Sequence, residues 1–155
     1  MAPTAETRLA ALGIELPEPP ISVANYVATL RLSNMLFVPG QLCLDRGALV
    51  ATGCVGTSVT LEDATAAARA CAINILAQCR SSLGSLDRVR QVVRLGGFIA
   101  SAPHFEDQAT VMNGASDLMV EVFGDAGRHT RSTVGVSALP KGAAVEIEAV
   151  FEIEP

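Results

Sequence analysis

An arginine, a threonine and a glycine, spaced two residues apart near the carboxyl end of the chain, could together bind a small anion. Arg131 precedes the segment Ser-Thr-Val-Gly-Val. A β-strand alternates its side chains between two faces, which places Arg131 on the same face as Thr133 and Gly135. A guanidinium can bind a carboxylate through two parallel hydrogen bonds, a geometry that lysine cannot match. The pattern predicts a carboxylate site, and the alternative is a surface arginine paired with a nearby glutamate.

Other polar side chains could also take part in chemistry. Glu146 is one of four glutamates at even spacing in the last predicted strand, a pattern typical of a solvent-facing side. If a neighbouring subunit covered that side, Glu146 could position or deprotonate a water molecule. Tyr26, the only tyrosine, could be a core residue, an interface residue or a hydrogen-bond donor. His104 and His129 lie at predicted helix and loop ends, where a cap or a surface position is the simpler interpretation.

Motifs for cofactor or metal chemistry are missing from the sequence. It has no G-x-x-x-x-G-K-[ST], G-x-G-x-x-G, G-x-S-x-G or H-E-x-x-H motif. Its four cysteines form no C-x-x-C pair, and two histidines give no zinc-ligand spacing. Cys71 and Cys79 fall in a helical pattern and are interpreted as small core residues. We therefore expect no cofactor and no metal.

The composition indicates the kinds of partner to expect. A net charge of −5, with a single lysine, argues against nucleic acid or an anionic membrane as the main partner. Half of the 155 residues are hydrophobic and 17% are charged, more apolar surface than one domain core is expected to bury. The surplus predicts a homo-oligomer. Unpaired cysteines, with no apparent export signal or membrane span, predict a cytoplasmic protein.

Hydrophobic periodicity divides the chain into strands and helices. The predicted strands cover about residues 26–31, 35–39, 88–100, 132–137 and 143–153. The predicted helices cover about residues 4–13, 60–84 and 105–123. This order is too mixed for a doubly wound fold, and it predicts an α+β sandwich with two helices on one face of a mainly antiparallel sheet. Residues 1–23, with a proline-rich stretch that cannot continue a helix, are predicted to be an N-terminal arm before a single domain of residues 24–155.

The C-terminal third resembles the signature of a known family. The segment Arg131-Ser-Thr-Val-Gly-Val136, then Leu139-Pro140, then Val145-Glu-Ile-Glu-Ala149 is similar to the Rid family pattern A-R-S-x-V-x-V, L-P, V-E-I-E-A. Rid proteins are the reactive intermediate deaminases, also called the YjgF-type or L-PSP family. Three other segments agree with the family in the same order, namely residues 34–41, 78–93 and 107–113. The resemblance covers about residues 24–153.

The resemblance implies a chorismate-mutase-like α+β fold, a trimer, and ligand clefts between subunits. Active family members hydrolyse reactive 2-imino or 2-enamino acids to 2-keto acids and ammonia, without metal or organic cofactor, and so detoxify metabolites. Arg131 matches the arginine that binds the substrate carboxylate, and Glu146 the glutamate associated with the attacking water. Tyr26 matches the tyrosine near the pocket, whereas Gly40 and Asn113 match lesser pocket or structural positions.

Three places depart from the family pattern. Thr133 stands at the pocket floor, where Cys or Ser is usual, Pro39 replaces a Ser before Gly-Gln, and His129-Thr130 replaces Pro-Ala. These departures indicate a divergent subgroup. The function expected is imine or enamine deamination, and the alternative is a non-catalytic trimer that binds a 2-keto acid or similar small carboxylate. Endoribonuclease activity is disfavoured by the acidic balance, and chorismate mutation would rest on fold analogy alone.

Overall fold

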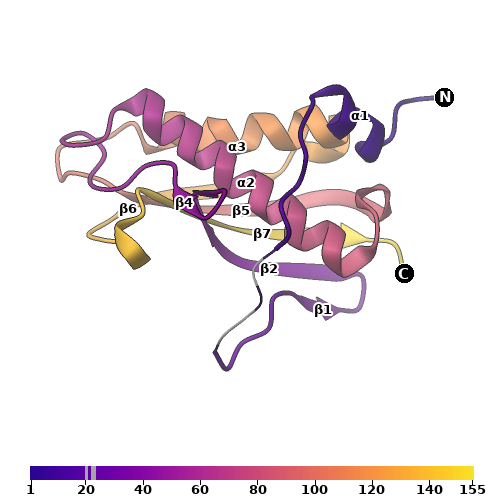
Figure 1. Cartoon of the computed structure of the whole chain (residues 1–155). Helices are drawn as coiled ribbons and strands as arrows, with labels where there is room; N and C mark the ends of the chain where they lie inside the picture. The colour runs from indigo at the N-terminus through magenta and orange to yellow at the C-terminus, as the bar shows by residue number, and fades with distance from the viewer. Residues whose placement is uncertain (20, 22–23) are drawn as a thin grey trace.

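Five strands form one sheet in the described part of the chain, and two long helices lie on one face of it (Figure 1). The computed structural model describes residues 1–19, 21 and 24–155. The helices are α1 (Ala5–Ala11), α2 (Leu61–Leu83) and α3 (Gln108–Phe123). The sheet contains β1 (Leu30–Leu32), β2 (Met35–Leu42), β5 (Val89–Ala100), β6 (Thr130–Val136) and β7 (Val145–Ile153). Two short strands that were not predicted, β3 (Leu44–Asp45) and β4 (Ala48–Leu49), form a separate hairpin.

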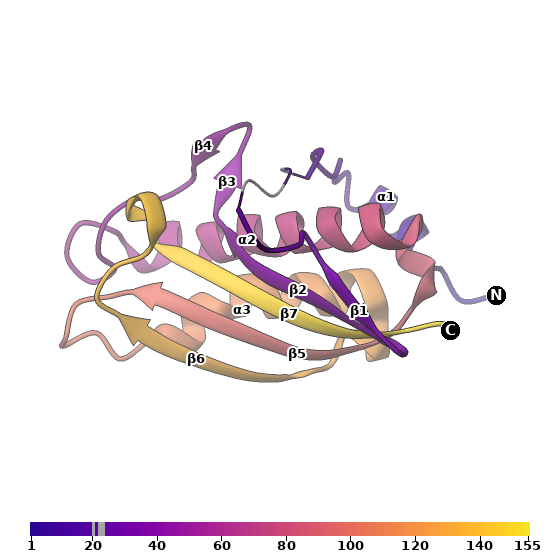
Figure 2. The same ribbon diagram turned by 90° about the horizontal axis from the view of Figure 1, so that it is seen from below.

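The strands lie in the order β1-β2-β7-β5-β6 across the sheet (Figure 2). Neighbouring strands are antiparallel except β5 and β6, and α3 makes the crossover connection that this parallel pair requires. Strands β6 and β7 are consecutive along the chain but do not pair, because β5 lies between them. The predicted α+β sandwich with a mainly antiparallel sheet is confirmed.

Helix α2 has clear start and stop residues. The hydroxyl of Thr60 accepts a hydrogen bond from the backbone N–H of Asp63, 3.1 Å away, and Glu62 and Asp63 place negative charge in the first turn. Gly84 ends the helix in the left-handed conformation, with φ of 83°. The buried face of the helix is mostly alanine, with Cys71 and Cys79 among its members. The prediction that these two cysteines are core residues is confirmed, and burial raises the pKa of the Cys79 thiol to about 12.

Two predicted element starts are wrong. The first strand covers only Leu30–Leu32, and Tyr26 lies in a bend before it. Continuing the β1–β2 register would bring Ala28 opposite Pro39, which has no N–H to donate to the ladder. Helix α3 begins at Gln108 rather than at Phe105, and the backbone N–H of Phe105 belongs to a separate turn that it closes with the carbonyl of Ala102, at 3.0 Å.

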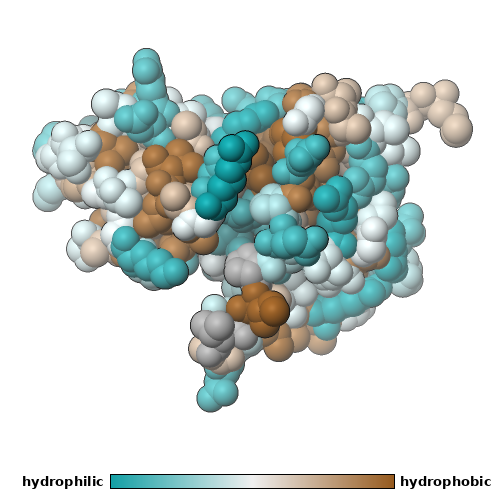
Figure 3. Space-filling model, viewed as in Figure 1, coloured by the Kyte–Doolittle hydropathy of each residue, from teal (hydrophilic) through white to brown (hydrophobic). Residues whose placement is uncertain are grey.

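The two faces of the sheet differ in what covers them. Along β7 every second side chain, from Val145 to Ile153, is buried beneath α2 and α3, whereas Glu146, Glu148 and Glu152 lie on the opposite face. We call this second side the open face; in Figure 2 it is turned toward the viewer, with the helices behind it. On the side seen in Figure 3, apolar patches alternate with hydrophilic ones.

Helix α1 is attached to the rest of the domain through a carboxylate and one apolar side chain. Glu6 accepts a hydrogen bond from the backbone N–H of Leu86, at 2.8 Å, and pairs with Arg80, at 3.4 Å. Leu9 is buried in the common core. The division of the chain at residue 23 stays a prediction. None of the described helices is long and apolar enough to cross a membrane.

Helices α2 and α3 approach most closely at Gly114. A methyl group at this position would collide with the backbone carbonyl oxygen of Thr65. We expect Gly114→Ala to lower the free energy of unfolding by about 1–3 kcal/mol, because the overpacking outweighs the roughly 1 kcal/mol that alanine gains over glycine in a helix. Urea unfolding measures this change. Asp117→Ala introduces the same residue at an exposed position of α3 and should change stability by less than about 0.5 kcal/mol. Equal stability of the two variants would contradict the close approach.

Candidate functional site

Arg131 lies on β6 and reaches across to α3. It stands opposite Leu95 of β5, so its side chain is on the face that the helices cover. Its Nη1 donates to Asn113 Oδ1 at 2.8 Å and to Ser116 Oγ at 3.0 Å. Its Nη2 donates to the backbone carbonyl of Ala109 at 3.2 Å. The structure therefore brings together Arg131 and Asn113, two of the residues predicted for the site.

Thr133 continues the same face, two residues after the arginine. It stands opposite Gly97, and an added methyl group on that glycine would lie 3.3 Å from the threonine Cγ2. Its Oγ1 is buried and has no hydrogen-bond partner in the described part of the chain. An unpartnered buried hydroxyl is costly. We call Arg131, Asn113, Ser116 and Thr133 the arginine cluster.

The arginine cluster leaves donors available. A guanidinium has five N–H groups, and three of those of Arg131 are engaged by Asn113, Ser116 and Ala109. Two N–H groups remain without a partner among the described residues. The alternative of an arginine paired with a glutamate is not realised among those residues, since none of the ion pairs present involves Arg131. Two free donors are the number that a bidentate pairing between a guanidinium and a carboxylate uses.

Glu146 lies on the open face, beside Gly40 of β2. A methyl group on Gly40 would lie 2.6 Å from the Oε1 of Glu146. A larger residue at position 40 would therefore require this carboxylate to move. Both residues line a groove of about 1270 Å³ that extends along β2 toward the N-terminal segment, and Tyr26 and Lys141 line it too. We call Tyr26, Gly40 and Glu146 the glutamate cluster. Three more predicted site residues are thus brought together.

The environment of Glu146 favours its protonated form. Partial burial is the larger cause of a raised pKa, and the negative charge of Glu148, two residues along the same face, is the second. A carboxylate whose pKa is raised toward neutrality is better suited to accept and return a proton than an ordinary exposed glutamate. Among the described residues, no group of three or more His, Cys, Asp or Glu side chains is placed to hold a metal ion.

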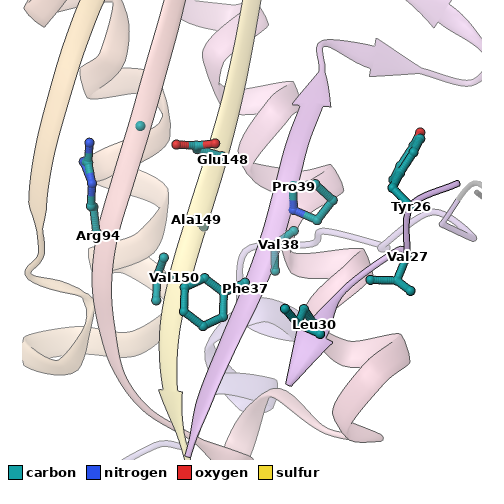
Figure 4. A pocket seen from close by; sticks show the side chains of 11 residues that line it. Tyr26, Val27, Leu30, Phe37, Val38, Pro39, Arg94, Glu148, Ala149 and Val150 are labelled. Atoms are coloured by element: carbon teal, nitrogen blue, oxygen red, sulfur yellow. The ribbon is translucent and has the colours of Figure 1, made fainter. Parts of the chain in front are cut away.

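A second hollow lies beside the glutamate cluster on the open face. Its volume is about 440 Å³, and its lining residues come from β1, β2, β5 and β7 and from the segment before β1 (Figure 4). Arg94 of β5 and Glu148 of β7 bring charge to one part, and Phe37 and Val150 lie next to each other in another. Tyr26 lines this hollow as well as the groove. Arg94 is not among the site residues predicted from the sequence, although the sequence places it in a predicted strand, two residues before Gly96-Gly97.

The two clusters lie on opposite faces of the same sheet. Arg131 stands opposite Leu95, and Leu95 stands opposite Ala149, so all three share the helix-covered face. Glu146 precedes Ala149 by an odd number of residues and therefore points to the open face. A single chain does not bring Arg131 and Glu146 together.

Sequence reasoning also missed Ser116, a partner of the arginine, and the pairing of Ser116 with His129. Ser116 is one helical turn beyond Asn113, a spacing that places both on one side of α3, and this signal was available. The sequence predicts His129 to be a cap or surface residue, and its ring does contact the carbonyl of Gly127, the last residue of a short 3-10 helix. This histidine is half-buried, and its ring nitrogens lie 2.9 Å from Ser116 Oγ and 2.6 Å from the carbonyl oxygen of Gly127. His104 is exposed, as predicted.

The chain matches a described family of proteins. The family "YjgF/chorismate_mutase-like, putative endoribonuclease" matches residues 6–150. The chain belongs to this YjgF-type family, which confirms the resemblance found in its sequence.

Three similar proteins span nearly the whole chain. Protein TCP17 of Trypanosoma cruzi is 45% identical over 158 residues, which cover 99% of each chain. The crystal structure of Atu1372 from Agrobacterium tumefaciens, a protein of unknown function, is 44% identical with a TM-score of 0.90, covering 98% of this chain and 93% of that one. A structure from Shewanella oneidensis, described as a putative endoribonuclease, is 32% identical with a TM-score of 0.94, covering 97% and 100%.

The raised pKa of Glu146 can be tested through its charged neighbour. We expect Glu148→Gln to lower the pKa of Glu146, because it removes the second cause of the shift while burial keeps the pKa above the ordinary range. The titration of the Glu146 side-chain carboxyl, followed by carbon NMR, measures this change. Glu154→Gln, at the exposed end of the chain, is the matched control and should leave the midpoint unchanged. A midpoint that stays fixed or rises in Glu148→Gln would contradict the assigned cause.

Proposed function

We propose that the protein hydrolyses 2-imino or 2-enamino acids to 2-keto acids and ammonia, at clefts formed between copies of the chain. The observation that supports this most strongly is the arginine cluster. Two free N–H groups of Arg131 lie on the same face as the buried, unpartnered hydroxyl of Thr133. This combination suits a carboxylate with a polar atom next to it, as a 2-imino acid has.

The chemistry requires orientation and one proton carrier. In the proposed reaction, Arg131 holds the substrate carboxylate while Glu146 of a neighbouring copy accepts a proton from water. The water oxygen forms a bond to the imine carbon, and the C=N π electrons move to nitrogen. For an imine bound in its protonated form, Glu146 then returns its proton to the nitrogen to give C(OH)–NH3⁺, and it takes the hydroxyl proton as the C=O bond forms. The C–N bond breaks, ammonia leaves the 2-keto acid, and Glu146 releases its proton to solvent. An enamine first takes a proton on carbon to become the imine. Positioning and electrostatics supply the acceleration.

The proposed assembly is a homotrimer, and the open face supports an interface. Four apolar side chains on this face are exposed by 39–65% in the single chain: Leu30, Leu32, Phe37 and Val134. Isolated exposed apolar residues are common, but these come from three strands of one uncovered sheet face. A neighbouring copy that covered them would also bring a second arginine cluster within reach of Glu146.

A second candidate is a trimer that binds a 2-keto acid without turnover. The observation that favours it is that the arginine cluster is complete in one chain, whereas Glu146 is not part of it. Binding would then need only Arg131 and its neighbours. Endoribonuclease activity is not proposed, although the family description names it, because the chain has a net charge of −5 and a single lysine.

Two variants separate these functions. We expect Glu146→Gln to reduce imine hydrolysis at least about 100-fold while 2-keto acid binding survives, because only the proton carrier is removed. Arg131→Ala should weaken both. An amino-acid oxidase supplies the imine in situ, and semicarbazide competes for it, so that less semicarbazone forms when the enzyme is active.

The matched controls are Glu152→Gln, on the same face of β7, and Arg128→Ala, a nearby exposed arginine. Both should behave as the wild type. Wild-type protein that binds keto acids but never lowers the semicarbazone yield would favour the non-catalytic trimer. A Glu146→Gln variant with full turnover would remove that residue from the mechanism.

A further inference from the structure

We propose that Ser116 and His129 are positioning residues for the carboxylate site: they form a hydrogen-bonded pair that holds the Arg131 guanidinium in its binding orientation. This inference rests on the proposed carboxylate site. The pair connects three parts of the fold, namely α3, the segment between α3 and β6, and β6 itself.

The direction of the bond to Gly127 follows from the atoms at its two ends, and the direction of the bond to Ser116 then follows for a neutral ring. The carbonyl oxygen of Gly127 can only accept, so the ring nitrogen 2.6 Å from it, His129 Nδ1, carries the proton. In the neutral ring Nε2 is then an acceptor, and the hydroxyl of Ser116 donates to it across 2.9 Å. Because the hydroxyl of Ser116 then donates its proton to His129, the serine oxygen is free to accept a hydrogen bond from Arg131 Nη1, 3.0 Å away.

This arrangement decides which donors the arginine offers to a ligand. Ser116 and Asn113 occupy both N–H groups of Nη1, and Ala109 occupies one of Nη2. The N–H groups left over are one on Nε and one on Nη2. When Ala109 accepts from the Nη2 hydrogen that faces Nη1, these two N–H groups are parallel and match the two oxygens of a carboxylate. If Ser116 no longer accepted from Nη1, the guanidinium could turn and lose this match.

The anchor of the pair is rigid. Gly127 is buried, and a methyl group on it would collide with the backbone carbonyl of Met119 on α3. The carbonyl that orients His129 is thus fixed against the same helix that carries Ser116. A ring held at both nitrogens between these points has a single tautomer and orientation.

A serine next to a histidine could also be read as a nucleophile with its base. The oxygen of Ser116 already accepts a hydrogen bond from Arg131 Nη1, 3.0 Å away, and is therefore engaged by the guanidinium that it would have to leave in order to attack a substrate. The geometry therefore favours positioning. Labelling of Ser116 by a fluorophosphonate probe would overturn this assignment.

The experiment compares pyruvate with pyruvamide, which has the same shape without the carboxylate charge. Binding of each to Ser116→Ala, Ser116→Thr and wild-type protein is measured by ligand-observed NMR. We expect Ser116→Ala to weaken pyruvate binding about ten-fold and pyruvamide binding less than about two-fold, because a hydrogen bond to a charged group is lost. Ser116→Thr keeps the hydroxyl and should restore pyruvate binding to within about three-fold of wild type. Equal losses for the two ligands, or no loss, would overturn the proposal.

A second measurement needs no ligand and therefore separates this inference from the proposed function. Nitrogen NMR of the wild type should show His129 as the neutral Nδ1–H tautomer, and Ser116→Ala should shift its Nε2 resonance and make the Arg131 guanidinium signals exchange faster. The Nε2–H tautomer in the wild type would overturn the pair. Wild-type protein that binds no pyruvate would contradict the carboxylate site, and the NMR result would still decide whether the pair exists.

Discussion

The alternation of side chains between the two faces of the sheet determines where the residues of the proposed site can lie. Because β5 joins β6 to β7 in a fixed register, Arg131 must share a face with Leu95 and Ala149. Glu146 must then point the other way. Shifting β7 by one residue would exchange its buried apolar residues for glutamates, so burial of the apolar set under α2 and α3 fixes the separation of the two clusters. In the proposed trimer, each copy would therefore contribute an arginine cluster to one cleft and a glutamate cluster to another.

Close packing of α3 on the sheet makes the arginine cluster possible. Gly97 leaves room for Met112, whose sulfur would lie 2.6 Å from an added methyl group on that glycine. With α3 seated this near to the sheet, Asn113, Ser116 and the Ala109 carbonyl reach the Arg131 guanidinium directly. The contacts that pack α3 on the sheet are therefore also those that the proposed chemistry needs. Three acceptors hold the Arg131 guanidinium, and this restricts its motion.

Periodicity in the sequence was sufficient for most of the fold. The even spacing of the glutamates in the last strand predicts a solvent-facing side, and the structure places them opposite the buried apolar residues of β7. The helical pattern around Cys71 and Cys79 predicts core positions, and both residues are buried on α2. Element starts were less predictable. Local pattern could not reveal that Pro39 limits the pairing of β1, or that the N–H of Phe105 is used in a turn.

The candidate site was predictable in its members but not in its arrangement. Alternation within one strand placed Arg131 and Thr133 together, and family resemblance supplied Asn113, Glu146 and Tyr26. The two-sided arrangement could not be predicted, because it depends on which strands become neighbours, and consecutive strands β6 and β7 do not pair. The contact between His129 and Ser116 could not be predicted for a similar reason. The two residues lie on different elements, and nothing in the local sequence indicates that they meet.

The most direct test of the central claim mixes two inactive variants. The claim is that a working site combines the arginine cluster of one copy with the glutamate cluster of another. Arg131→Ala and Glu146→Gln subunits would be unfolded, combined in equal amounts and refolded together, and imine hydrolysis measured. If each site takes its arginine from one copy and its glutamate from another, roughly a quarter of the wild-type sites become intact, since each site draws its two residues independently. We predict that the mixture recovers about this fraction of the wild-type activity, although each preparation is inactive alone. A mixture as inactive as its components, although it has assembled into trimers of both chains, would contradict it.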